Sequence, residues 1–166
     1  MHPDSMYLMS QFVQKYGDRI RDKAVLDVGS QDINGSYRQM FEGVGCKYTG
    51  TDIVSGPNVD VLTGFDRLCF DDASFDVVIS GQTLEHAEKP WLLVKEMARV
   101  LRPGGIVCWI APWRFQVHRD GLCPYDRWRI LDDGMKVLIA EAGLTLLECA
   151  MHADDTYGIG EKSNVE

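Results

Sequence analysis

The sequence predicts an α/β fold built on one doubly wound, mainly parallel sheet. Three observations support this prediction. Strand-like and helix-like segments alternate along the chain, which is the pattern of right-handed crossover connections. The run from Phe75 to Ser80, FDVVIS, is almost continuously apolar, as expected of a parallel strand covered on both faces. Finally, 166 residues with 45% hydrophobic and 25% charged side chains suit a single domain, residues 1–166, with one sizeable core.

Apolar residues at helical spacing predict the helices. Helices are expected over 5–16, with Ser5 as N-cap and Gly17 as stop, and over 131–142. A third begins at Glu88 or Pro90 and is broken by the turn RPGG, residues 102–105, before the fifth strand. Asn34 is expected to cap a shorter helix that ends at the glycines 43 and 45.

Short apolar segments between these helices predict the strands. The expected strands are 24–28, 47–53, 75–80, 106–110 and 144–151, with a weaker one over 58–62. Residues 155–162, DTYGIGEK, are expected to form a last strand at an edge of the sheet, although glycines weaken strand structure.

Charge and cysteine usage disfavour several classes of function. The net charge is −8, and no cluster of basic residues occurs beyond Arg127 and Arg129. Nucleic acid and an anionic membrane surface are therefore disfavoured as partners. The five cysteines are scattered and form no CxxC pair, which predicts neither disulfides nor a metal site. The first residues do not resemble a signal peptide, and no apolar run would span a membrane. We therefore expect a cytoplasmic protein; the oligomeric state stays open.

The segment LDVGSQDINGSYR, residues 26–38, has the strand–turn–helix form of a cofactor loop. It lacks the GxxxxGK of a P-loop and the GxGxxG of a dinucleotide loop, and Asp27 and Asp32 would repel a pyrophosphate. Asp52 follows at the end of the next strand, where a carboxylate can accept hydrogen bonds from both ribose hydroxyls. These residues favour an adenosine cofactor with a positive centre and no pyrophosphate.

Four motifs together resemble a known family. VLDVGSQDINGSYR, YTGTDI, FDVVISGQTLEHAEKPW and LRPGGIV resemble the successive motifs of class I S-adenosylmethionine-dependent methyltransferases, over roughly residues 20–151. The likeness is strongest to the small-molecule methyltransferases with LEH after the fourth strand. It implies a Rossmann-like sheet of about seven strands with helices on both faces, S-adenosylmethionine as cofactor, and methyl transfer to a small-molecule acceptor. The opening loop departs from the pattern, because only Gly29 and Gly35 stand where the family has several closely spaced glycines.

The resemblance also implies a set of cofactor-binding residues. Asp27 corresponds to the acid near the cofactor's amino-acid end, Asp52 to the ribose-binding acid, and Ile53 to the residue that packs on adenine. The full set is Asp27, Gly29, Ser30, Asp52, Ile53, Phe65, Asp66, Ser80, Gly81 and Gln82.

The segment from Trp109 to Trp128 is rich in aromatic residues interleaved with polar ones, as in a small-molecule pocket. Either it forms a lid over the substrate, or it is a structural cover anchored by an ion pair between Asp126 and an arginine. Its candidate substrate residues are Trp113, His118, Arg119, Tyr125 and Arg129.

His86 and His118 are the candidate general bases, because histidine titrates near neutrality. For His86, a structural hydrogen bond near a helix start is the favoured alternative. Two other functions stay open: a catalytically inactive, methyltransferase-like binding protein, and, less favoured because of the glycine pattern, a nicotinamide-dependent oxidoreductase.

Overall fold

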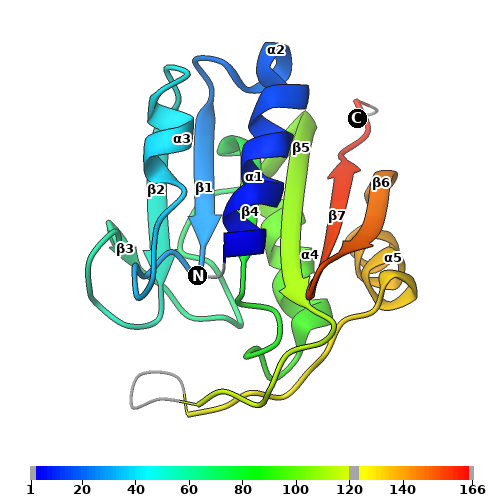
Figure 1. The fold of residues 1–166 in the computed structure, drawn as a ribbon. Helices are drawn as coiled ribbons and strands as arrows, with labels where there is room; N and C mark the ends of the chain where they lie inside the picture. Colours follow the sequence, from blue (N-terminus) through cyan, green and yellow to red (C-terminus); the bar gives the residue numbers. More distant parts are fainter. Residues whose placement is uncertain (1–2, 120–123, 165–166) are drawn as a thin grey trace.

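The computed structural model describes residues 3–119 and 124–164, which form a seven-stranded sheet with helices on both faces (Figure 1). The strand order is β3-β2-β1-β4-β5-β7-β6, which confirms the predicted doubly wound α/β fold. The strands are β1 (Ala24–Val28), β2 (Lys47–Asp52), β3 (Val61–Leu62), β4 (Phe75–Gly81), β5 (Leu101–Pro112), β6 (Thr145–His152) and β7 (Asp155–Glu161).

All strands run parallel except β7, which is antiparallel to both β5 and β6. From β1 the chain winds first toward β2 and β3, and then returns to place β4 on the other side of β1. This reversal is a topological switch point, and the carboxyl ends of β1, β2 and β4 meet at the sheet edge beside it. Ligands of open α/β sheets bind at such an edge.

Alternation along the strands produces two cores, one on each face. Val25 of β1 packs toward α1 (Pro3–Lys15), α2 (Gly17–Ile20) and α3 (Arg38–Glu42), whereas its neighbour Leu26 packs toward α4 (Pro90–Val100) and α5 (Asp132–Glu141). Both residues are fully buried. Figure 1 shows α1 and α3 in front of the sheet and α4 and α5 behind it. Among the described residues, no helix is long and apolar enough to cross a membrane.

The predicted edge strand is wrong in its position, because β7 lies between β5 and β6 and β6 forms the edge. Its glycines serve the packing of α5. A Cβ atom at position 158 would lie 2.5 Å from Met135 Cγ, and one at position 160 would lie 3.1 Å from Ile139 Cδ1. These glycines therefore let a helix approach an internal strand closely.

Three local predictions are also corrected. RPGG is not a turn before the strand but an irregular part of β5, where Gly104 has a φ of +74° and the register against β4 shifts. The short helix begins at Arg38, so Asn34 does not cap it. Ser5 lies inside α1, where its hydroxyl hydrogen-bonds the buried Tyr37 hydroxyl.

Substituting Gly158 with alanine should destabilise the protein by about 1–3 kcal/mol, because the new methyl group overlaps the Met135 side chain. Urea unfolding measures this change. The matched control is Gly17→Ala, since a Cβ atom there has no neighbour within 4 Å. Equal stability of the two variants would contradict the packing role assigned to Gly158.

Candidate active site

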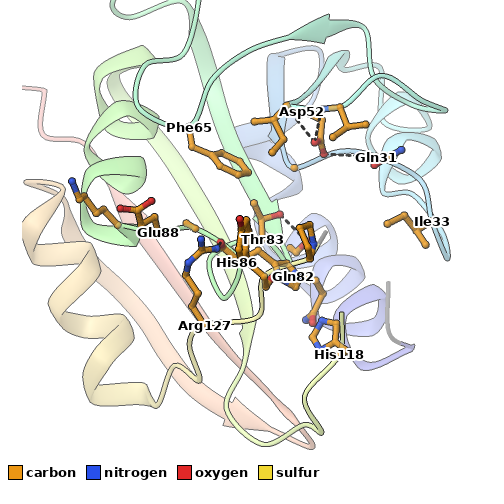
Figure 2. A pocket seen from close by; sticks show the side chains of 18 of the residues that line it. Gln31, Ile33, Asp52, Phe65, Gln82, Thr83, His86, Glu88, His118 and Arg127 are labelled. Carbon is orange, nitrogen blue, oxygen red and sulfur yellow. Dashed lines mark hydrogen bonds between the residues drawn. The ribbon is translucent and has the colours of Figure 1, made fainter. Parts of the chain in front are cut away.

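A cavity of about 470 Å³ opens at the carboxyl ends of β1, β2 and β4, within the usual size range of small-molecule sites (Figure 2). Its walls come from the loops after these strands and from the segment that follows β5. The lining residues are Gly29, Gln31, Ile33, Asn34, Asp52, Ile53, Val54, Phe65, Asp66, Gly81, Gln82, Thr83, His86, Ala87, Glu88, Lys89, His118, Pro124, Tyr125 and Arg127.

The loop after β1 is shaped by one glycine and by hydrogen bonds. Gly29 has a φ of +81°, and a Cβ atom there would lie 1.9 Å from Thr83 Oγ1, so no other residue fits this turn. Further along, the carboxylate of Asp32 accepts a hydrogen bond of 2.7 Å from the amide of Gly35. The Asp32 amide donates to Pro57 O at 3.0 Å. Hydrogen bonds to the side chain and from the backbone of Asp32 therefore hold the loop where closely spaced glycines are absent.

Asp52 is fixed on the cavity wall by backbone donors. Its Oδ1 accepts hydrogen bonds from the amides of Ile53, at 2.7 Å, and Val54, at 3.2 Å, and its Oδ2 accepts one from Gln31 at 3.2 Å. Ile53 and Ile33 both line the cavity and keep 48% and 51% of their surface exposed. Half-exposed aliphatic side chains beside an oriented carboxylate suit a ligand with an apolar ring and adjacent hydroxyl groups.

Three of the predicted cofactor residues, Asp27, Ser30 and Ser80, are buried and are not among the described lining residues. Ser80 donates to Val28 O at 2.8 Å, and Ser30 donates to Asn58 O at 3.1 Å. Asp27 accepts a hydrogen bond from the Tyr48 hydroxyl. Burial raises the pKa of Asp27 to about 7, even though that hydrogen bond lowers it. The three side chains form the layer beneath the cavity.

The loop after β4 brings Gly81, Gln82 and Thr83 to the cavity. A Cβ atom at position 81 would lie 2.0 Å from the Tyr37 hydroxyl, so Gly81 permits a close approach. Gln82 adopts a φ of +59° and donates to Asp155 Oδ1 at 2.9 Å, which ties the loop to the start of β7. Sequence analysis named Gly81 and Gln82 but missed Thr83, whose role depends on contact with Gly29.

At the other end of the cavity, the segment after β5 packs on the loop after β4. His86 Nδ1 donates to Tyr125 O at 2.6 Å, and the Arg127 guanidinium donates to His86 O at 2.7 Å. The backbone amides of Arg127 and Trp128 both donate to Glu85 O. Figure 2 shows Asp52 and Gln31 at one end of the site and Arg127 and His118 at the other. The site therefore joins an end near Asp52 to an end built around two histidines.

Glu85 is a residue that sequence analysis quoted within LEH but to which it gave no role. Its side chain is fully buried, and neither carboxylate oxygen has a hydrogen-bond partner among the described residues. Oε1 lies 3.6 Å from His86 Nε2. Burial raises the pKa of Glu85 to about 8. In the sequence, only its position next to the candidate base His86 pointed to a role for Glu85.

The predicted substrate residues separate into two groups. His118 and Tyr125 line the cavity, and so do the predicted cofactor residues Phe65 and Asp66. Among the described lining residues, Trp113, Arg119 and Arg129 do not occur. Trp113 Nε1 donates to Ala153 O at 2.9 Å, and Arg119 is exposed.

Arg129 forms the ion pair that the structural alternative required. Its guanidinium donates to both carboxylate oxygens of Asp126, at 2.6 and 2.8 Å, and lowers the pKa of Asp126 to about 2. The segment is therefore anchored by an ion pair and also lines the cavity with His118, Pro124, Tyr125 and Arg127. Residues 120–123, including Cys123, lie outside the described residues.

Comparisons with known proteins agree with this geometry. The family described as "Methyltransferase domain" matches residues 26–109, just over half of the chain. An uncharacterized methyltransferase of Mycobacterium avium (strain 104) is 34% identical over 127 residues, which cover 66% of this chain and 49% of that protein. The chain thus spans about half the length of the curated relatives it matches.

Two solved structures share the fold. The Burkholderia thailandensis 1,6-didemethyltoxoflavin-N1-methyltransferase, with bound 1,6-didemethyltoxoflavin and S-adenosylhomocysteine, superposes with a TM-score of 0.75 at 16% identity, over 96% of this chain and 78% of that one. A SAM-dependent methyltransferase from Aquifex aeolicus gives a TM-score of 0.68 at 14% identity, over 96% and 98%.

The chain belongs to the methyltransferase domain family. This match confirms the methyltransferase resemblance found in the sequence, and the two solved structures share the fold of the chain.

The buried carboxyl group of Asp27 predicts a pH dependence of stability. Its pKa is raised from 3.8 in the unfolded chain to about 7 in the folded protein, so the folded state binds the proton more tightly. The contribution to stability is therefore complete below the unfolded pKa and is lost as the pH rises through about 7. Between about pH 5 and about pH 8 we expect a loss on the order of 2 kcal/mol from this group.

The measurement is urea unfolding at both pH values for the wild type and for Asp27→Asn, which removes the titrating group and keeps its shape. The difference between the two pH slopes isolates Asp27, because other titrating groups contribute to both proteins. Identical slopes would show that Asp27 ionises in the folded state as readily as in the unfolded chain.

Proposed function

We propose that the protein transfers a methyl group from S-adenosylmethionine to a small-molecule acceptor. The observation that carries the proposal is one cavity at the switch point of the sheet, which extends from the oriented carboxylate of Asp52 to the histidines 86 and 118. Family membership and the order of the motifs support the choice of this cofactor.

In this proposal the cofactor follows the loops after β1, β2 and β4. Asp52 accepts hydrogen bonds from the ribose hydroxyls, and the adenine packs between Ile53 and Phe65, with Asp66 beside it. The methionine portion lies along Gly29, Gly81 and Gln82. Asp27, Ser30 and Ser80 act from beneath the cavity wall, where they hold the loops that contact the cofactor.

The acceptor occupies the end near His86, His118 and Tyr125. The sulfonium methyl group is already activated, so the protein needs mainly to place the acceptor atom in line with the carbon–sulfur bond and to exclude water. A cavity of about 470 Å³ lies within the size range of small-molecule sites, which supports a small acceptor. His86 or His118 takes the proton where the acceptor atom carries one.

The two alternative functions are a catalytically inactive binding protein and a nicotinamide-dependent oxidoreductase. Only an activity measurement distinguishes the inactive binding protein from an enzyme, because both would have this fold. The nicotinamide-dependent oxidoreductase has less support, because the family match is to methyltransferases and the loop lacks a dinucleotide glycine pattern.

Asp52→Ala should weaken the binding of S-adenosylmethionine and S-adenosylhomocysteine by about 10- to 100-fold, because charge-assisted hydrogen bonds to the ribose are lost. Calorimetric titration of both proteins with these compounds, and with NAD, measures the effect. The matched control is Asp71→Ala, which removes an exposed carboxylate away from the cavity and should bind as the wild type does.

If neither S-adenosylmethionine nor S-adenosylhomocysteine binds, the proposed function is wrong. Binding to the wild type that the Asp52 variant retains would place the ribose elsewhere. Once binding is established, formation of S-adenosylhomocysteine across a panel of hydroxylated and aminated small molecules separates an enzyme from a binding protein.

A further inference from the structure

Three side chains with metal-ligand chemistry converge at the acceptor end of the cavity. Glu85, His86 and His118 each offer one ligand atom, and these atoms all lie within 4.8 Å of one another. Ligand atoms of a zinc-type ion stand about 2.0–2.2 Å from the metal and therefore up to about 4 Å apart. Small side-chain rotations would bring the three atoms to that spacing.

The buried carboxyl group of Glu85 has unused ligand oxygens. It is fully buried, and neither of its oxygens has a hydrogen-bond donor among the described residues. Burying an ionised carboxylate without partners is costly, so such a group stays protonated unless a cation is bound. A metal ion at this place would stabilise the deprotonated form of Glu85. Its Oε1 is 3.6 Å from His86 Nε2, a separation that a cation bound to both atoms would explain.

Both histidines are oriented by oxygen atoms on the segment after β5. His86 Nδ1 donates to Tyr125 O, and His118 Nδ1 lies 3.4 Å from Asp126 Oδ2. Asp126 is itself held by Arg129. Metal-bound histidines typically donate their second ring nitrogen to a carbonyl or carboxylate in this way, which fixes the ring and makes it a better ligand.

We propose that Glu85, His86 and His118 bind a divalent transition-metal ion, of the Zn²⁺ or Fe²⁺ type, at the acceptor end of the cavity. Two imidazoles and one carboxylate suit these ions, whereas Mg²⁺ and Ca²⁺ prefer oxygen ligands alone. Three protein ligands leave a coordination position open, as in catalytic metal sites. Both histidines line the cavity, so the open position faces the acceptor.

Such a metal ion would select an acceptor that binds it through an oxygen atom. This assignment of the acceptor rests on the proposed methyl transfer. A hydroxyl bound to the ion has a lowered pKa and releases its proton to solvent. The resulting oxygen anion forms a bond to the methyl carbon as the carbon–sulfur bond breaks, and the electron pair stays on sulfur. In this arrangement both histidines are ligands, and the metal ion replaces the histidine base that methyl transfer without a metal would use.

The test is titration of the chelator-treated full chain with Co²⁺, followed by visible absorption and calorimetry. We expect one ion per chain and the absorption bands of a protein-bound Co²⁺, which Zn²⁺ then displaces. His118→Ala should weaken binding by on the order of 100-fold, because it removes a ligand. His152→Ala is the matched control, since His152 stacks on Tyr7 outside the cluster, and it should bind as the wild type does.

Circular dichroism checks that His118→Ala is folded, and Glu85→Gln supplies a second variant that keeps the shape of the buried side chain. Absence of stoichiometric Co²⁺ binding, or binding that both variants retain, would overturn the metal site. Titration of the metal-free protein with S-adenosylmethionine tests the proposed function separately. If S-adenosylmethionine binds but Co²⁺ does not, only the metal site is wrong. If Co²⁺ binds but S-adenosylmethionine does not, the proposed methyl transfer is wrong and the metal site stands.

Discussion

The structure of the site depends on one close contact, between the turn after β1 and the loop after β4. Gly29 has no side chain, so Thr83 can occupy the space beside it, and the Thr83 hydroxyl donates to Val28 O at 3.3 Å. Ser80 donates to the same carbonyl oxygen. These contacts hold together two strand ends that lie far apart in the sequence. The cavity opens above them, and the residues that follow each turn, Gln31 on one side and His86 on the other, become its walls.

Beneath this contact the protein buries an unusual set of acidic groups. Asp27, Glu85 and Asp155 are each fully buried, and burial raises the pKa of all three carboxyl groups. Each lies next to a residue of the site or directly beneath it. Such groups cost stability, as expected where a fold retains polar residues for binding rather than for packing. The proposed cofactor carries a positive sulfonium, and carboxyl groups beneath the cavity are consistent with its recognition.

The alternation of strands and helices could be predicted from the sequence because apolar periodicity is a local property. The position of β7 could not be predicted from the sequence. Its glycines leave room for Met135 and Ile139 of α5, and this packing is seen only in the folded protein. Asp52 could be placed at the site because strand ends share one edge of a parallel sheet. The separation of Arg129 from the cavity and the burial of Glu85 could not be predicted, since both depend on how the segment after β5 folds back. That path is set by tertiary hydrogen bonds to Glu85 O and Asp126.

The internal position of β7 has a consequence for synthesis of the chain on the ribosome. Residues 155–161 separate β5 from β6, so the side of β5 that faces β7 has no strand partner until they have been made. During that interval a long, largely buried strand presents unpaired backbone groups, a state prone to pairing with other chains. The bond from Gln82 to Asp155 also cannot form before then. Insertion of β7, and the hydrogen bond that ties it to the loop after β4, therefore come only after β5 and β6 have been made.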